Sequence, residues 1–185
     1  MTLRIIGGKY KGLLLKTPKS TSTRPTQGML REAVFNICQN QINDARFLDL
    51  FAGSGAIGFE ALSRGASHVT FVEQNKIAIA CLKENIAKLN VALQTQLLPL
   101  PAARALPFLA KQSKFNLVYI DPPYDTPFQS LLEGLKPLLA PHATVFIEER
   151  HSPKIQQTPP EFPFLQLIDS RRFGIALLHQ YQFKI

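Results

Sequence analysis

The sequence is poor in the residues that build metal sites and disulfide frameworks. It contains two cysteines, Cys38 and Cys81, which form no Cys-x-x-Cys pair and no cluster with histidine. The four histidines are scattered through the chain without ligand spacing: His68, His142, His151 and His179. We therefore expect no metal and no disulfide, and we expect both cysteines to be small core residues.

Long apolar runs are also missing. No run approaches the roughly 18 residues of a membrane span, and the opening MTLRIIGGKYKG lacks the apolar core of a signal peptide. Hydrophobic residues make up 45% and charged residues 18% of the 185 positions, which is typical of a soluble globular protein. We expect a cytoplasmic protein with no membrane partner.

Acidic residues are scarce, and their distribution is uneven. The chain has 13 Asp and Glu against 21 Lys and Arg, a formal net charge of +8. Seven basic residues precede the first acid, Glu32: Arg4, Lys9, Lys11, Lys16, Lys19, Arg24 and Arg31. This charge indicates either a solvated basic arm or a surface that contacts nucleic acid.

The order of apolar patterns predicts two parts. Residues 3–16 alternate apolar and basic residues around glycines, which predicts a short hairpin, followed by a polar linker and a helix over 27–41. After residue 43, short apolar runs such as RFLDLFA, HVTFVEQ and FNLVYI alternate with helical patterns at 102–111 and 128–139, among others. We therefore expect an appendage over 1–43 that packs on an α/β domain over 44–185. Its mostly parallel sheet should end in an antiparallel hairpin made of FLQLIDSRRF and GIALLHQYQF.

A glycine motif follows the first strand of the predicted sheet. In LDLFAGSGAIGFE, Gly53, Gly55 and Gly58 fit G-x-G-x-x-G between a strand and a helix, and Glu73 ends the next strand. This is the context of a nicotinamide or flavin site, although any adenosine-containing cofactor could use it. Asp49, inside the apolar strand, favours a cofactor that carries an ammonium and a sulfonium, because a buried carboxylate needs a partner. The alternative is a structural Asp bonded to the loop backbone.

A second motif, Asp-Pro-Pro-Tyr, follows the strand FNLVYI. At the carboxyl end of a parallel strand, Asp121 would face the same crevice as the glycine loop. The Asp121 carboxylate and the Pro122 carbonyl would accept two N–H bonds, and Tyr124 would offer a stacking face. Such a site suits methylation of the amine of a nucleobase that has left its stack. The alternative is an ordinary strand-ending turn.

Together these segments resemble a known family. RIIGGKYKG, RPT followed by REAVFN, LDLFAGSGAIGFEALSRGA, HVTFVE and DPPY are similar in order and spacing to the bacterial 16S rRNA guanine-N2 methyltransferases of the RsmD type, which are class I S-adenosylmethionine-dependent enzymes. The resemblance implies a Rossmann-like sheet of seven strands. It places the methyl donor, S-adenosylmethionine, across a set of residues in the glycine loop and its surroundings: Asp49, Phe51, Gly53, Ser54, Gly55, Glu73, Arg24 and Thr26.

The resemblance also implies the substrate side. Asp121, Pro122 and Tyr124 would hold the target guanine. RNA contacts would come from the basic hairpin and from an arginine pair near the end of the chain: Arg4, Lys9, Lys11, Arg171 and Arg172. The expected partner is 16S ribosomal RNA in an assembling small ribosomal subunit, and we expect a monomer.

One position departs from the family. Relatives carry an Asp-Ala pair after the third strand, whose acid meets the adenine amine, whereas Pro101 stands there in this chain. Proline has no side-chain acceptor, so we expect weaker donor affinity. Three other readings stay open: methylation of adenine N6 or of a protein glutamine amide, and an RNA-binding assembly factor without catalysis. The hypothesis of a nicotinamide oxidoreductase does not explain the motif from Asp121 to Tyr124.

Overall fold

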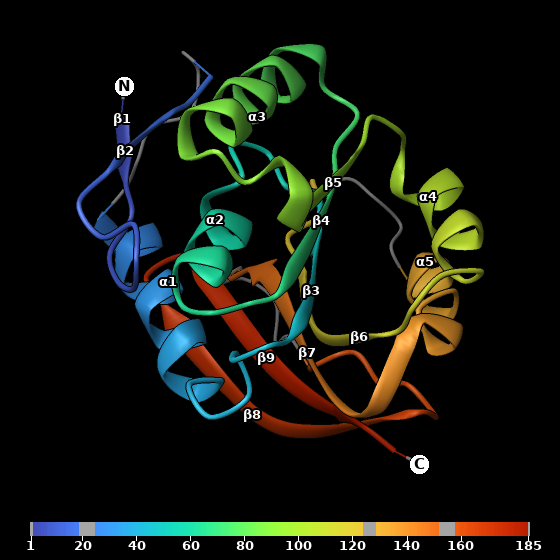
Figure 1. Cartoon of the computed structure of the whole chain (residues 1–185). Coiled ribbons are helices and arrows are strands. Elements are labelled where there is room, and N and C mark those ends of the chain that lie inside the picture. The colour runs from blue at the N-terminus through green and yellow to red at the C-terminus, as the bar shows by residue number, and fades with distance from the viewer. Residues whose placement is uncertain (1, 19–24, 124–128, 152–157, 185) are drawn as a thin grey trace.

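The computed structural model of the chain describes residues 2–18, 25–123, 129–151 and 158–184. Arg24 and Tyr124 lie outside the described residues, and the side chain of Thr26 is not described either. Figure 1 shows helices on both faces of a twisted central sheet. Within the described residues, none of the helices has the length and apolar character needed to cross a bilayer.

The sheet has seven strands in the order β5-β4-β3-β6-β7-β9-β8. Five are parallel: β3 (Arg46–Leu50), β4 (His68–Val72), β5 (Thr95–Leu98), β6 (Phe115–Ile120) and β7 (Leu139–Arg150). The hairpin of β8 (Leu165–Phe173) and β9 (Ala176–Phe183) pairs antiparallel along β7. The predicted fold class is confirmed. Because β3 pairs with β4 on one side and with β6 on the other, the strand order reverses between β3 and β6, where such sheets bind ligands.

Alternating residues of each strand face the two helical layers. One layer contains α1 (Pro25–Ile37), α2 (Ala56–Ser63) and α3 (Lys76–Leu89), and its core includes Phe47, Phe71 and Phe146. The other contains α4 (Ala102–Leu109) and α5 (Gln129–Glu133), which pack against Leu48 and Ile120. The prediction of one continuous helix over 128–139 was wrong. Instead α5 is followed by a 3₁₀ turn over Lys136–Leu138, because Pro137 lacks the N–H that a longer helix would need there. A second 3₁₀ turn, Ala92–Gln94, precedes β5.

The N-terminal segment forms its own two-stranded sheet of β1 (Thr2–Arg4) and β2 (Leu14–Lys16). It packs beside α2 and α3, on the same side of the molecule as α1 (Figure 1). Asn85 of α3 clamps its second strand, accepting from the Lys16 N–H at 2.8 Å and donating to the Lys16 carbonyl at 2.9 Å. The hairpin is thus fixed on the helical layer that also carries the glycine loop.

Candidate active site

The glycine loop leaves β3 through left-handed backbone. Phe51, Gly53 and Gly55 have φ of 70°, 54° and 78°. A Cβ on Gly55 would lie 2.5 Å from Leu82, and a Cβ on Gly58 would lie 2.2 Å from the Phe71 ring. Gly58 therefore serves the close packing of α2 on the sheet, while Gly53 and Gly55 let the chain turn. Phe51 adopts the left-handed conformation despite its side chain, and such outliers gather at functional sites.

Asp49 lies below this loop with 2% of its surface exposed. Its Oδ2 accepts the Gly58 N–H at 2.9 Å, so part of the structural alternative holds. Burial, followed by the neighbouring carboxylates of Asp121 and Glu73, raises the pKa of Asp49 to about 8. Its Oδ1 has no hydrogen-bond partner among the described residues, and the side chain lines a cavity. A cation in that cavity would stabilise the ionised form.

Glu73, at the end of β4, is held by backbone amides. Its Oε2 accepts from Gly53 at 2.7 Å, and its Oε1 accepts from Gln74 at 2.8 Å and from Asn75 at 2.7 Å. These bonds tie the glycine loop to the neighbouring strand and fix the carboxylate. Oε1 uses both of its lone pairs in these bonds, whereas Oε2 keeps one lone pair with which it can accept a hydroxyl.

Asp121 follows β6 and meets a second carboxylate that sequence reasoning missed, Glu148 near the end of β7. Burial of the carboxyl, followed by the charge of Glu148, raises the pKa of Asp121 to about 7. The residue as a whole is exposed, so solvent screens part of this effect. Burial also raises the pKa of Glu148, while its hydrogen bond from the Tyr119 hydroxyl opposes the rise. The sequence signal for Glu148 was weak, because an acid near a strand end usually marks the surface.

Three cavities meet at Phe51. A cavity of about 260 Å³ lies between Glu73, Gln74 and Pro122, and one of about 180 Å³ lies between Asp49, Asp121 and Glu148. Gly53, Ser54 and residues of α1 also line the second of these. A third, apolar cavity of about 520 Å³ continues toward α4 and α5. Because Phe51 lines all three, they adjoin at the switch point of the sheet, and we call them together the cleft.

Pro101 stands at the start of α4, in the wall of the apolar cavity. Its carbonyl accepts from Arg104 at 2.9 Å and from Ala105 at 3.1 Å, so α4 already uses it. Gln74, which directly follows Glu73, lines this cavity and the next one. Gln74 is the polar residue that lines the apolar cavity together with Phe51 and Pro101. In the sequence, only its position after the strand-ending Glu73 could have indicated this role.

The basic residues predicted to contact RNA lie in two places. In the N-terminal hairpin, Arg4 Nη1 donates to the Gly12 carbonyl at 2.8 Å, the Lys9 ammonium lies 5.3 Å from the Tyr10 ring centroid, and Lys11 is exposed. On β8, the exposed Arg171 pairs with Asp169 at 2.6 Å, and Arg172 Nε donates to the Gly174 carbonyl at 2.9 Å.

The register of the C-terminal strands relates this arginine pair to the site. Arg171 lies opposite Leu178, which lies opposite Glu148. The arginines therefore flank the same end of the sheet as the carboxylates, about 10 Å away at the usual strand spacing.

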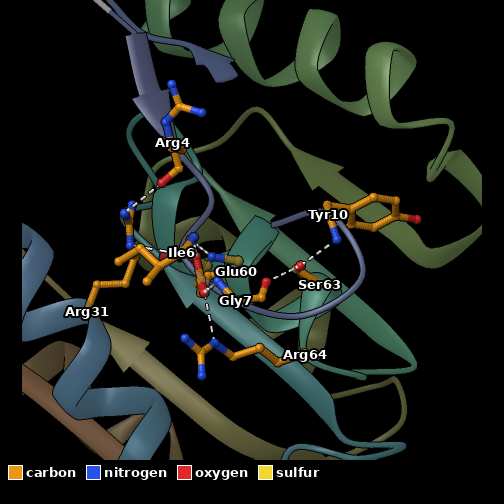
Figure 2. Close-up of polar contacts among 10 residues, drawn as sticks. Arg4, Ile6, Gly7, Tyr10, Arg31, Glu60, Ser63 and Arg64 are labelled. Carbon is orange, nitrogen blue, oxygen red and sulfur yellow. Dashed lines mark hydrogen bonds and ion pairs between the residues drawn. The ribbon is translucent and has the colours of Figure 1, made fainter. Parts of the chain in front are cut away.

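A buried carboxylate anchors the N-terminal hairpin (Figure 2). Glu60 of α2 is fully buried and accepts the N–H groups of Ile6 and Gly7, each at 2.8 Å, and Arg64 Nε at 2.8 Å. Arg31 of α1 lies 3.8 Å from the same carboxylate and donates to the Arg4 carbonyl at 2.9 Å. We call this arrangement the Glu60 clasp. Sequence reasoning missed it, although both partner segments, RIIGG and EALSRG, were noted.

Sequence comparison relates the chain to named proteins. The family model described as Conserved hypothetical protein 95 matches residues 3–182. The chain is 33% identical to ribosomal RNA small subunit methyltransferase D of Haemophilus influenzae over 97% of this chain and 93% of that protein. It is 41% identical to the protein of the same name from Escherichia coli, over 66% of this chain and 60% of that protein.

Structural comparison agrees. The solved structure of yhhF from Escherichia coli superposes with a TM-score of 0.83 at 32% identity, covering 100% of this chain and 99% of the other. An S-adenosylmethionine-dependent methyltransferase from Agrobacterium tumefaciens, 20% identical, shares the fold with a TM-score of 0.60 over 71% of this chain and 46% of its own. The chain therefore shares the fold of S-adenosylmethionine-dependent methyltransferases, and it belongs to the Conserved hypothetical protein 95 family, together with the ribosomal RNA small subunit methyltransferases D.

Proposed function

We propose that the protein transfers a methyl group from S-adenosylmethionine to the exocyclic N2 amine of one guanine in small-subunit ribosomal RNA. The observation that carries the proposal is the meeting of Asp49 and Asp121 in one cavity at the switch point of the sheet. A carboxylate that a cation would stabilise and a carboxylate that can accept amine N–H bonds thus line the same cavity. The names of the relatives from Haemophilus influenzae and Escherichia coli support ribosomal RNA as the substrate.

The residues present fit the donor. Asp49 offers a buried carboxylate to an ammonium, Gly53 and Ser54 of the glycine loop line the same cavity, and Glu73 Oε2 keeps one lone pair for a ribose hydroxyl. Gln74 and Phe51 line the cavity that would take the adenine, so the Gln74 amide would supply the contact that Pro101 lacks. When bound, S-adenosylmethionine supplies a methyl group on a positively charged sulfur.

The protein's part in the reaction is positioning and electrostatics. An exocyclic amine is a poor nucleophile because its lone pair is conjugated with the ring. Accepting its N–H bonds at Asp121 and at the Pro122 carbonyl would localise that lone pair toward the methyl group. The new C–N bond would replace the methyl–sulfur bond, whose electron pair would stay with the sulfur, and the amine would lose one proton. Asp121, whose pKa of about 7 lies near neutrality, can hold that proton. Tyr124 would stack on the base, as the family resemblance implies.

The test is to incubate the protein with labelled S-adenosylmethionine and small ribosomal subunits that lack the modification, and then to identify the labelled nucleoside. N2-methylguanosine at one position is the expected result. Detection of labelled N6-methyladenosine would instead identify adenine as the target base. Absence of label from subunits and naked RNA, with donor binding intact, would favour a non-catalytic RNA-binding protein.

A protein substrate is the second candidate, and one comparison favours it. The chain is 32% identical over 143 residues to a protein named release factor glutamine methyltransferase from Leptospira interrogans, covering 49% of that protein. Label found only in the protein fraction of the same experiment would support this alternative.

A further inference from the structure

Glu148 lies where the target base would enter. It stands two residues beyond Phe146 on β7, and Phe146 lies opposite Tyr119 of β6, which lies opposite Asp49 of β3. Because side chains alternate across a strand, Asp49, Tyr119 and Glu148 project from the same face of the sheet. With Asp121 they line the cavity of about 180 Å³. Glu148 is therefore on the substrate side of the cleft, beside the proposed acceptor of the amine.

Hydrogen bonding fixes what Glu148 can offer. The hydroxyl of Tyr119, a residue with 3% of its surface exposed, donates to Glu148 Oε2. Because the hydroxyl donates, the Glu148 carboxylate acts as an acceptor. Its other oxygen, Oε1, has no hydrogen-bond partner among the described residues. Tyr119 thus orients the side chain, and one carboxylate oxygen is available to a ligand in the cavity.

A simpler interpretation is that the Tyr119–Glu148 pair only completes the packing of the core. That interpretation does not explain why Glu148 lies beside other acids. Asp49, Asp121 and Glu148 line one cavity, and in that cavity the facing cation among the described residues is Arg31, which the Glu60 clasp already engages. Acids brought together repel each other, and the charge of Glu148 adds to the larger effect of burial in raising the pKa of Asp121. An arrangement of adjacent acceptors is suited to a ligand edge with adjacent donors.

Guanine has such an edge. Its N2 amine and its N1–H are neighbouring donors, whereas adenine carries an acceptor at N1. If Asp121 accepts from the amine, as the proposed function on which this inference rests requires, the next acceptor would meet N1–H. We propose that Glu148 accepts the N1–H of the target base and so selects guanine, with Tyr119 as the positioning residue. A base with a lone pair at N1 would face the carboxylate with like polarity and leave it unpaired, a mismatch that buried polar sites reject strongly.

The test uses a base that keeps the 2-amino group but has a lone pair in place of the N1 proton and lacks the O6 carbonyl. Glu148→Gln separates the N1 effect from the O6 effect, because it changes only the group that would face N1. Small-subunit RNA is prepared with guanine or 2-aminopurine at the methylated position, and kcat/KM is measured for both. We expect the wild type to favour guanine by about 10²-fold or more. In Glu148→Gln, Tyr119 would hold the amide oxygen and the NH₂ would face N1. We expect guanine methylation to fall by about 10²-fold and 2-aminopurine methylation to be retained within about threefold, so that the preference is lost.

Glu149→Gln is the matched control, because Glu149 is the neighbouring residue of β7 and pairs with His179 at 3.0 Å on the opposite face. It should keep the guanine preference. Glu148→Asp retains an acceptor and should keep the preference with a lower kcat, which covers the case in which Glu148→Gln fails to fold. Donor affinity, measured by calorimetry, should be unchanged in all three variants.

The outcomes separate the two proposals. A wild type that methylates guanine and a Glu148→Gln variant that slows both bases equally would overturn the role of Glu148 and leave the proposed function standing. A wild type that binds the donor but methylates neither RNA would overturn the proposed function and this inference with it.

Discussion

At the scale of single residues, the site is defined by acids whose protonation depends on what they face. Asp49 has one backbone partner and a pKa of about 8, so at neutral pH the folded protein holds a proton there. Because the folded pKa lies above the ordinary value near 4, ionising this group opposes folding. Its contribution to stability is fully present below about pH 4 and declines as the pH rises toward about 8.

Donor binding should therefore release a proton from Asp49. An ammonium beside the carboxylate favours the ionised form, so titration calorimetry at pH 7 in buffers of different ionisation enthalpy should show a net release of up to about one proton per donor bound. Asp49→Asn should bind more weakly and lose most of this release. Identical enthalpies in all buffers for the wild type would contradict the assignment.

Asp121 should matter for turnover and not for donor binding. Asp121→Ala removes an acceptor that acts on the amine, so we expect kcat to fall by about 10²- to 10³-fold while the donor Kd stays within about twofold. Asp121→Asn, which keeps one acceptor oxygen, should retain more activity. A near-normal kcat for Asp121→Ala would remove this residue from the mechanism.

At the scale of elements, the Glu60 clasp joins the N-terminal hairpin to α2. Removing the carboxylate in Glu60→Ala would leave two backbone N–H groups and two arginines without their buried partner. We expect a loss of about 3 to 5 kcal/mol in the free energy of unfolding, measured with denaturant.

Glu84→Ala is the control, because Glu84 makes an exposed pair with Lys16 and should cost less than about 1 kcal/mol. Glu60→Gln keeps one acceptor and should lie between the two. Equal stability of Glu60→Ala and Glu84→Ala would show that the clasp contributes little.

Elements also show what the sequence could and could not predict. The strand, glycine turn and helix of LDLFAGSGAIGFE could be predicted, because periodicity and glycine spacing are local signals. The clasp could not, because Glu60 binds backbone amides 53 and 54 positions away and backbone amides have no sequence signature. Glu148 was missed for a related reason: its importance comes from the strand register that sets it beside Asp121.

At the scale of the whole molecule, the net charge of +8 suits a polyanionic partner. If Lys9 and Lys11 contact phosphates, replacing both with alanine should weaken RNA binding. The slope of log K against log salt should become shallower by about 1.4 to 1.8, as measured by fluorescence titration over a range of salt.

Lys111 and Lys114 provide a control of equal charge. They precede β6, at the amino ends of the parallel strands and thus at the opposite end of β6 from Asp121. Replacing both should leave the slope nearly unchanged. The same change in slope for both pairs would mean that the basic hairpin acts only through net charge.

The Glu60 clasp also bears on the order of folding during synthesis. The ribosome makes Ile6 and Gly7 more than fifty residues before Glu60, the side chain that satisfies their amides. At roughly 5 to 20 residues per second, this segment waits several seconds for its partner. Residues that are made before α2 are therefore among those that dock late, and the hairpin can close on the protein only once α2 has emerged.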